Sequence, residues 1–365
     1  MLKYAVRRIL QAIPVLIGIS IVIYSILLIA PGGPEARFAQ NPRITAEQIA
    51  AFRHRWGLDQ PIPVQYCKWL GVCGDKPFLV NALPGGTIEL AGVKITLPGG
   101  DNGILHGDLG FSTTDGRPVA AIIGDRLPAT LILAGTAWVI WVILALISGV
   151  YAAVKRYSLF DSALTIFNYI GLAFPTFWLG IMLITIFAGA LHWFPAGGMW
   201  TTRTVPPFGT PDYWAFFGAQ PLTALSDLGR HMILPVITLV AVSIAYDSRF
   251  VRSSMLDSLN QDYIRTARAK GVPERSVVFR HALRNALLPV ITNLGLEIPF
   301  LFTGAFVTES IFGWPGMGAQ FIQSTANFDY PVLMGLLSVT AVVTVFANLA
   351  ADLAYAVVDP RVKFD

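Results

Sequence analysis

The segment from Tyr263 to Arg275 carries the residues of this chain best suited to binding chemistry: Tyr-Ile-Arg-Thr-Ala-Arg-Ala-Lys-Gly-Val-Pro-Glu-Arg. Its cations are suited to charge-assisted contacts with a partner. Gly271 is the residue type that most readily takes the left-handed conformation ending a helix, and Pro273 suits the first turn of the next helix. The pattern predicts a helix, a turn and a second helix that dock as a rigid knob on another protein. The alternative is a basic loop resting on anionic lipid headgroups.

Apolar residues at a four-residue spacing lead into this segment, and they predict one helical stripe that holds it against the rest of the chain. They are Val251, Met255, Leu259, Tyr263 and Ala267, with Leu256 and Ile264 beside them. The opposite face carries Arg252, Asp262, Arg265 and Arg268. The predicted docking residues are Asp262, Tyr263, Arg265, Thr266, Ala267, Arg268, Ala269, Lys270, Gly271, Pro273 and Arg275.

Catalytic and metal-binding motifs are absent from the sequence. The two cysteines and five scattered histidines do not have zinc-site spacing. Neither the phosphate-binding pattern G-x-x-x-x-G-K-[ST] nor the nucleophile elbow G-x-S-x-G occurs. We therefore expect no catalytic residue, no metal site and no cofactor on this chain, and we do not expect an enzyme.

The composition indicates an integral membrane protein. Of the 365 residues, 54% are hydrophobic and only 13% are charged, whereas soluble domains carry roughly 25% charged residues. The net charge of +4 is explained by basic loops on the cytoplasmic side of a membrane. No nucleic-acid-binding motif accompanies it, so nucleic acid is not an expected partner.

The elements that must position the docking segment are apolar runs long enough to cross a hydrocarbon core of about 30 Å. We predict an all-α membrane fold with about six transmembrane helices, spanning 9–30, 128–154, 164–191, 232–250, 287–306 and 332–358. Pro175 is expected to kink the third helix. The fifth is interrupted by Pro289, Gly295 and Pro299.

Basic residues set the expected orientation, with both termini in the cytoplasm. Arg7 and Arg8 precede the first run, which is longer than the apolar core of a signal peptide and is predicted to stay uncleaved. Asp247 and Arg249 are expected to mark the cytoplasmic end of the fourth helix. The predicted divisions are 1–30, a transmembrane helix; 31–126, an extracytoplasmic region with an insertion; and 127–365, a core containing an outer insertion at 197–230 and a cytoplasmic loop at 251–284.

The outer region has three features of its own. A short helix is predicted over 45–54, with Thr45 as N-cap, and the alternation over 87–96 predicts a β-hairpin. An extracytoplasmic position permits a disulfide between Cys67 and Cys73; two free thiols are the alternative, because sequence does not supply the bridging geometry. The aromatic stretch at 193–230 suits an interfacial belt or a surface helix.

Glu297 lies inside the fifth apolar run and is a candidate residue of a translocation pathway, since ionisable residues within a membrane are usually functional. The alternative is a carboxylate near a helix end or paired with a neighbouring helix. Asn168, Asn293 and Asn348 are expected to form hydrogen bonds between helices.

The segment around Gly271 resembles the cytoplasmic signature loop of permease subunits in ATP-binding-cassette importers. The general pattern is Glu-Ala-Ala, three residues, Gly, nine residues, Ile-x-Leu-Pro; here Arg265-Thr-Ala, Gly271 and His281-Ala-Leu-Arg284 occupy those places. This variant is similar to the first, B-type permease of the dipeptide, oligopeptide and nickel branch. Further matching pieces include Trp56-Gly-Leu-Asp-Gln-Pro, Gly107-Asp-Leu-Gly-Phe-Ser, Arg126-Leu-Pro-Ala-Thr, Pro175-Thr-Phe-Trp-Leu-Gly, Glu309-x-Ile-Phe-Gly-Trp-Pro-Gly-Met-Gly and Asp359-Pro-Arg.

The resemblance implies a type I importer: this chain, a second homologous permease, two ATPase subunits that hold ATP and Mg, and an extracytoplasmic solute-binding protein, all in the plasma (inner) membrane of a bacterium or archaeon. It implies that segment 262–275 transmits ATPase closure to the membrane helices. Arg265 stands where the family pattern has Glu, so a different partner residue is implied there. The insertions at 72–103 and 197–228 have no counterpart in the resemblance.

Peptides are the cargo that the resemblance favours, and nickel chelates, glutathione and oligosaccharides remain alternatives. A different class of protein, an ion-coupled secondary transporter, would show inverted repeats and broken helices with intramembrane acid–base residues. The sequence shows no convincing repeat.

Overall fold

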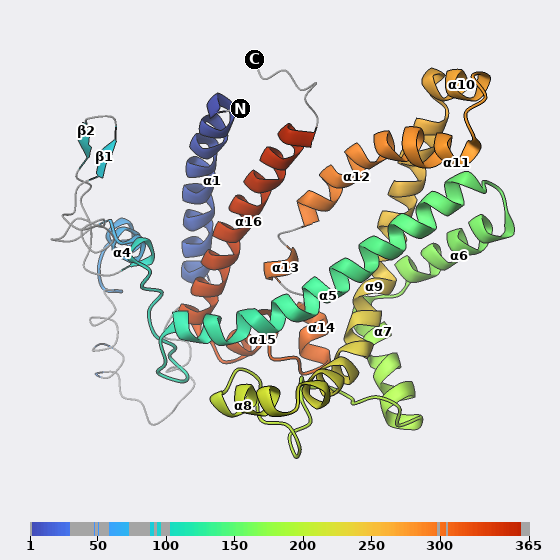
Figure 1. The fold of residues 1–365 in the computed structure, drawn as a ribbon. Coiled ribbons are helices and arrows are strands. Elements are labelled where there is room, and N and C mark those ends of the chain that lie inside the picture. Colours follow the sequence, from blue (N-terminus) through green and yellow to red (C-terminus); the bar gives the residue numbers. More distant parts are fainter. Residues whose placement is uncertain are drawn as a thin grey trace. The chain divides into compact units, whose positions relative to one another are not determined.

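The computed structural model describes residues 2–29, 47, 50, 58–72, 88–90, 93–95, 103–297, 300–303 and 306–358. Most of these are helical (Figure 1). The α-helices are α1 Leu2–Ile29, α4 Ile62–Leu70, α5 Val119–Val154, α6 Leu159–Ala173, α7 Thr176–Leu183, α8 Pro211–Ala219, α9 Pro221–Leu259, α10 Asp262–Ala269, α11 Glu274–Ser276, α12 Leu283–Glu297, α13 Phe300–Thr303, α14 Phe306–Ile311, α15 Met317–Ala326 and α16 Tyr330–Val358.

The remaining elements are short. A 3-10 turn covers Ile104–His106, and π-helical turns extend α7 over Ile184–Ala190 and precede α12 over Val277–Ala282. Strands β1 Ile88–Leu90 and β2 Val93–Ile95 pair antiparallel, which confirms the predicted hairpin. The helix predicted over 45–54 lies outside the described residues apart from Glu47 and Ala50, both of which are helical.

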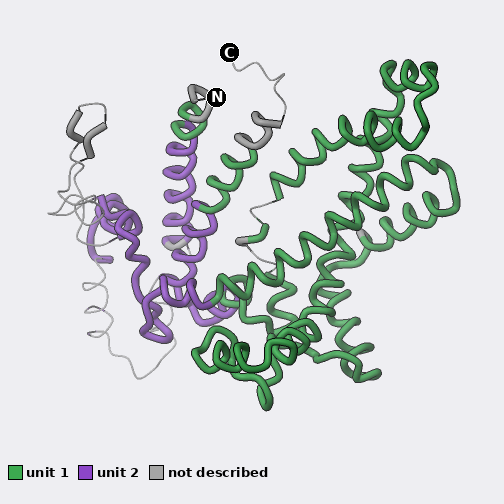
Figure 2. Tube along the Cα trace, viewed as in Figure 1, with its two compact units in different colours: residues 1–10, 126–320, 343–365 green, residues 11–125, 321–342 purple. Residues whose placement is uncertain are grey.

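The chain divides into two units (Figure 2). Unit 1 comprises residues 1–10, 126–320 and 343–365, and unit 2 comprises residues 11–125 and 321–342. The predicted docking segment and Glu297 both belong to unit 1, while Cys67 belongs to unit 2.

The predicted membrane character is confirmed. Among the described residues, four helices are long and apolar enough to span a bilayer, at Val6–Ile26, Val119–Val154, Pro221–Leu259 and Tyr330–Ala351. The pair Leu159–Gly171 and Thr176–Ala190 makes a fifth if it counts as one span. That pair is bent by 98° at the break containing Pro175, where the sequence predicted a kink. The predicted fifth span falls on α12, α13 and α14 with undescribed residues between them, so the count of six stays a prediction.

The core of unit 1 forms where α5 packs on α9. On α5 the buried residues Ala129, Leu133, Ala137, Trp141 and Ala145 repeat every four positions and so form one face of the helix. The facing residues of α9 are Met232, Val236 and Leu239. Small residues let the backbones approach closely: a Cβ added at Gly149 would collide with the backbone oxygen of Ser248. The long helix α9 also packs against α6, α7 and α12, which makes it the central element of the unit.

Unit 2 contains its own core. The ring of Tyr24 of α1 meets Tyr66 edge to face and Trp69 at a tilt, both on α4, and its hydroxyl donates a hydrogen bond of 3.0 Å to Gln65. Met334 of α16 joins this cluster. Near the start of α16 the buried carboxylate of Asp329 accepts hydrogen bonds from the Ser112 hydroxyl and from the backbone and hydroxyl of Thr113. The motif ending in Ser112 is therefore tied to a residue more than 200 positions later in the chain.

Candidate functional site

The docking segment folds as a helix, a left-handed turn and a second helix, in the predicted order. Helix α10 covers Asp262–Ala269, and Gly271 has φ +74°, a conformation that L-residues with a side chain rarely adopt. The N–H of Gly271 donates to the Arg268 carbonyl at 2.9 Å, and the N–H of Val272 donates to the Ala267 carbonyl at 3.2 Å. These bonds satisfy carbonyls left open at the helix end. Pro273 immediately precedes α11, as its N-cap.

The prediction of one continuous stripe from Val251 to Ala267 is wrong in one respect. Helix α9 ends at Leu259, and α10 begins after a break at Asn260 and Gln261. The break rotates the pattern, so Ile264 rather than Tyr263 is the buried residue of α10. Tyr263 is 40% exposed, and its hydroxyl instead hydrogen-bonds the Ser258 hydroxyl at 2.7 Å.

An apolar cluster fixes the docking segment to unit 1. Ile264 and Met255 are fully buried against Val277 and Val278 of the π-helical turn and Ala286 of α12. Ser258, in the last turn of α9, donates a hydrogen bond of 2.8 Å to the Ala282 carbonyl. Residues of α5, α9, the π-helical turn and α12 all contribute to this cluster, so one face of α10 is fixed against unit 1 while its other face stays open.

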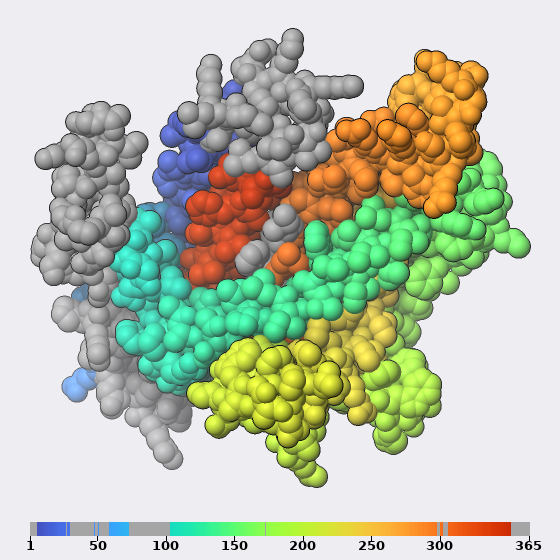
Figure 3. All heavy atoms as spheres, in the orientation of Figure 1, coloured from blue at the N-terminus to red at the C-terminus, as the bar shows by residue number. Residues whose placement is uncertain are grey.

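The open face carries the predicted docking residues. All of them are exposed except Ala267, which is half-buried. In Figure 3 the segment, in orange, projects from the surface of unit 1. Arg268 forms a two-pronged ion pair with Glu274, with distances of 2.6 and 3.1 Å, and Arg265 lies 3.4 Å from Asp262. The hydrogen bonds from Arg268 lower the pKa of Glu274, so this carboxylate is ionised over the physiological range. Lys270 and Arg275 add further positive charge beside the turn.

Arg252 does not belong to the exposed face, contrary to the prediction. Its Nε and Nη2 atoms donate to the two carboxylate oxygens of Asp161, at 2.8 and 2.9 Å. Asp161 also accepts the N–H of Tyr157 at 2.9 Å, and its side chain is only 5% exposed. The pair ties the beginning of α6 to α9, so Arg252 supports the docking segment from within the unit.

Glu297 is brought together with two other polar residues inside unit 1. The amide nitrogen of Asn293 lies 3.4 Å from Glu297 Oε1 and 3.2 Å from Asp247 Oδ1. The indoles of Trp138 and Trp141 lie beside Glu297. Asp247 is 3% exposed, so it is an interior residue of unit 1, and its predicted place at the cytoplasmic end of a span stays a prediction. The predicted helix-to-helix role of Asn293 is confirmed, since it joins α12 to α9.

A second polar cluster joins two quoted motifs, Arg126–Thr130 and Glu309–Gly318; we call it the Glu309 latch. Glu309 is fully buried, and its Oε2 accepts the backbone N–H groups of Gly318 and Ala319 at 2.7 and 3.1 Å. Its Oε1 accepts the hydroxyl of Thr130 at 3.0 Å. Thr130 in turn accepts the N–H of Met317 at 2.8 Å.

The remaining contacts of the latch explain why its second motif contains a tryptophan and closely spaced glycines. The Trp314 indole is fully buried and donates a hydrogen bond of 2.8 Å to the Ala129 carbonyl. A Cβ at Gly316 would meet the carboxylate of Glu309 and the hydroxyl of Thr130, so glycine is required for this approach. Sequence reasoning used the two motifs only as signs of resemblance. The sequence signal is an acidic residue followed by a Gly-Trp-Pro-Gly turn and then by the start of a helix. That order indicates a carboxylate that caps the first backbone N–H groups of the helix.

Cys67 lies half-buried in the last turn of α4 and is disulfide-bonded, so the alternative of a free thiol is wrong for this residue. Cys73 lies outside the described residues, so its pairing with Cys67 stays a prediction.

The chain is similar to known proteins over its whole length. The family described as binding-protein-dependent transport system inner membrane component matches residues 142–364, and the corresponding N-terminal family matches residues 1–80. The oligopeptide transport system permease protein AppB of Bacillus subtilis is 39% identical over all of both chains. The dipeptide transport system permease protein DppB of Escherichia coli K12 is 34% identical, covering all of this chain and 99% of its own. A glutathione transport system permease protein, GsiC of Escherichia coli O6:H1, is 34% identical over all of both chains.

Proposed function

This chain belongs to the family of binding-protein-dependent transport system inner membrane components, and from that premise we propose that it imports peptides as one permease of an ATP-binding-cassette importer. Full-length relatives named for oligopeptide and dipeptide transport support this cargo. A relative named for glutathione transport, itself a tripeptide, lies within the same class. The family assignment disfavours the ion-coupled alternative.

The single observation that carries the coupling role is the geometry of the docking segment. Residues 262–275 form a capped, two-helix knob whose underside is buried through Ile264 and whose outer face is exposed. A rigid projection of this kind can transmit displacement of a partner to α9 and α12, against which it is anchored. A loop that only rested on lipid headgroups would need neither the left-handed cap at Gly271 nor the buried anchor.

The proposed assembly contains a second homologous permease, two ATPase subunits that hold ATP and Mg, and an extracytoplasmic binding protein. The chain is placed in the inner membrane with six spans and both termini in the cytoplasm. Closure of the ATPase dimer displaces the knob, and the spans move as rigid bodies between inward-facing and outward-facing states. A disulfide between Cys67 and Cys73 and contact of the two outer insertions with the binding protein complete the proposal.

The experiment places a bulky side chain on the exposed face of the knob. Ala269 is exposed on α10, so Ala269→Trp leaves the buried cluster intact while it obstructs a close-fitting groove. We expect normal membrane insertion, loss of ATPase co-purification and loss of ATP-driven peptide uptake. Ala163→Trp is the matched control, because Ala163 is equally classed as exposed but lies on α6, outside the segment.

A second variant addresses the turn itself. Gly271→Pro removes the N–H that bonds Arg268 and is incompatible with φ +74°, since proline requires φ near −65°. We expect expression with lost uptake. Retained uptake and retained ATPase binding in both Ala269→Trp and Gly271→Pro would overturn the coupling role, whereas failure of the complex to transport any peptide would overturn the cargo.

A further inference from the structure

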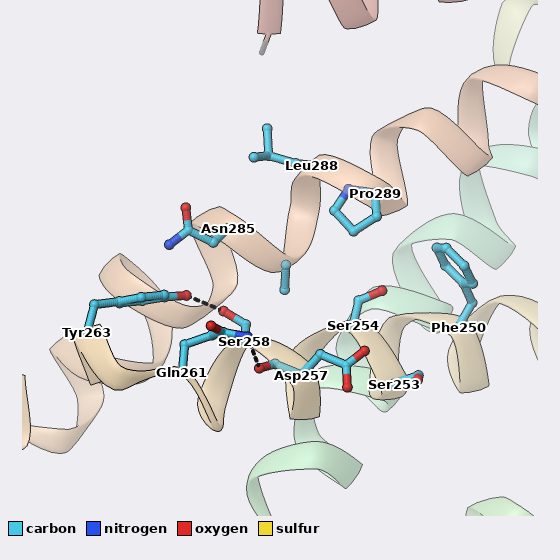
Figure 4. Close-up of a pocket in the computed structure, with 11 residues that line it drawn as sticks. Phe250, Ser253, Ser254, Asp257, Ser258, Gln261, Tyr263, Asn285, Leu288 and Pro289 are labelled. Carbon is cyan, nitrogen blue, oxygen red and sulfur yellow. Dashed lines mark hydrogen bonds between the residues drawn. The ribbon is translucent and has the colours of Figure 1, made fainter. Parts of the chain in front are cut away.

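A cavity of about 740 Å³ opens between α9, α10 and α12 (Figure 4). Side chains from the end of α9, including Ser253, Ser254 and Asp257, face Asn285 and Pro289 of α12 across it. Tyr263 of the docking segment closes one end. A space of this size matches the range of roughly 300–1,000 Å³ found for small-molecule sites.

A second cavity, of about 560 Å³, continues the first along α12. The two share Phe250, Asn285, Leu288 and Pro289, and the second adds Thr292, Asn293 and Leu296. The α12 residues that line them stand at spacings of three and four, so they form one face of that helix. The two cavities are therefore one groove, which we call the α9–α12 groove, and it leads from the docking segment to Asn293.

The lining of the groove combines apolar residues with many polar ones. Nine of its side chains carry hydroxyl, amide or carboxylate groups: Ser253, Ser254, Asp257, Ser258, Gln261, Tyr263, Asn285, Thr292 and Asn293. Hydrocarbon chains cannot satisfy such groups, and leaving them unsatisfied in a bilayer costs several kcal/mol each. The same groups match the donors and acceptors of a peptide main chain.

Two acids, Asp247 and Glu297, lie behind the inner end of the groove, in contact with a residue that lines it. Asn293 lines the groove and contacts both Asp247 and Glu297. In the described part of the chain no lysine, arginine or histidine forms an ion pair with either acid. Glu297 Oε2 and the Nε1 of Trp141, on a side chain 3% exposed, make no hydrogen bond of normal geometry there, although the Trp141 indole lies beside Glu297. Two carboxylates in a low-dielectric interior repel each other, and either a shared proton or a cation between them removes that repulsion.

We propose that the α9–α12 groove is the cytoplasmic exit of the peptide path, and that Asp247 and Glu297 hold the α-ammonium group of the passing peptide at its inner end. The proposal rests on the importer assignment and adds to it the path and the recognised group. The polar groups of the groove bind the main chain. Asp257 is the charged residue among those that line the two cavities, and the acids behind Asn293 supply charge selection at the inner end.

Accessibility of single cysteines tests the groove in the intact transporter. Ser253→Cys and Thr292→Cys line it, and Phe346→Cys is the matched control, because Phe346 is 59% exposed on α16 and lies outside the groove. In inside-out vesicles a charged, membrane-impermeant thiol reagent is expected to label positions 253 and 292 and to spare 346. The unsubstituted protein gives the background of Cys67 and Cys73.

Two outcomes overturn the groove assignment. Labelling of 292 only by a lipid-soluble reagent would mean that lipid occupies the groove. Resistance to both reagents, with cross-linking of 292 to the second permease, would mean that the partner permease covers it. Neither result bears on the importer function, which is tested separately by measuring whether these variants take up peptide.

Protection of the cysteine at position 292 tests the ammonium contact without the binding protein. Trialanine added from the cytoplasmic side is expected to slow labelling, and N-acetyl-trialanine is expected to require about a tenfold higher concentration or more, because it lacks one charge-assisted contact. With Asp247→Asn and Glu297→Gln added together, which removes both acids, the two peptides should protect at similar concentrations. Equal protection by the two peptides before those substitutions would overturn the ammonium role while leaving the groove in place.

Discussion

The docking segment and the Glu309 latch both lie in unit 1, and both place polar or charged groups around a turn that contains glycine. They differ in whether those groups are exposed or buried. In the docking segment the charged groups are exposed and only Ile264 of α10 is buried. In the latch Glu309, Thr130 and Trp314 are all fully buried, and each has hydrogen-bond partners at 3.1 Å or less. The latch closes on itself, whereas the docking segment leaves its polar groups available to another molecule.

The difference between the two regions determines which measurement should respond to a substitution in each of them. Breaking a buried, fully bonded acid leaves several groups unsatisfied, so it should reduce the stability of the fold. Breaking an exposed ion pair changes the folded state little, because water replaces the partner. Variants of the latch should therefore appear in unfolding measurements, and variants of the docking segment should appear in coupling.

The largest effect is expected at the latch. Glu309→Ala removes the acceptor for two backbone N–H groups and for Thr130, and breaking a buried charged network typically costs about 3–5 kcal/mol. The measurement is the thermal midpoint of the purified protein compared with wild type. Glu274→Ala is the control, since its carboxylate is 59% exposed. Equal midpoints for the two variants would remove the distinction between the regions.

A smaller effect is expected at the one buried residue of α10. Ile264→Ala leaves a cavity beneath the docking segment, and such truncations cost about 2–5 kcal/mol in a closed core. We expect a cost near the lower limit of this range, because α10 can move inward and partly fill the cavity. Hydrogen exchange of the amides of α10 should accelerate while that of α15, whose first amides Glu309 holds, stays unchanged. Acceleration in both helices would show that the two regions unfold together.

Much of the docking segment was predictable because its signals are local. Gly271 and Pro273 marked the turn, and the alternation of apolar and charged residues marked the helix faces. The break at Asn260 and Gln261 was not predictable from spacing, since either one long helix or two short ones fits the four-residue repeat. The break is what moved burial from Tyr263 to Ile264.

Contacts between distant parts of the chain were beyond the sequence. The bonds from Thr130 to Glu309, from Arg252 to Asp161 and from Asn293 to Asp247 join residues 46 to 179 positions apart. Composition was enough to predict a membrane protein, and hydrophobic periodicity located most helices. Neither of them predicts which helices pack together or which of their residues meet. For the same reason the sequence identified Glu297 as an acid within an apolar run but did not predict that Asp247 and Asn293 lie beside it.

Matched glycine substitutions sharpen the comparison. At Gly316 of the latch an added Cβ meets Glu309 and Thr130, and such overpacking costs about 1–3 kcal/mol. At Gly271 nothing lies within 4 Å, so Gly271→Ala adds only backbone strain of about 1–2 kcal/mol. Thermal midpoints should fall further for Gly316→Ala. If Gly271→Ala proved the more destabilising, the docking segment would be more tightly packed than its exposure indicates.

The smallest effect concerns the ion pair between Arg268 and Glu274, and it depends on pH and salt. Because Arg268 lowers the pKa of Glu274, the pair stabilises the turn at pH values above the ordinary carboxyl value, and this contribution is lost as the pH falls through the lowered pKa. Both side chains are about half exposed, so screening by water keeps it below about 1 kcal/mol. Hydrogen exchange around Gly271, corrected for intrinsic rates, should show Glu274→Gln less protected than wild type at pH 7. The two proteins should become equal once the pH falls below the lowered pKa of Glu274. High salt should shrink the difference at pH 7 and leave protection at the buried Glu309 latch unchanged, because screening acts on exposed charges. A salt-dependent latch would mean that water reaches Glu309, and the contrast between a closed and an open polar cluster would then be lost.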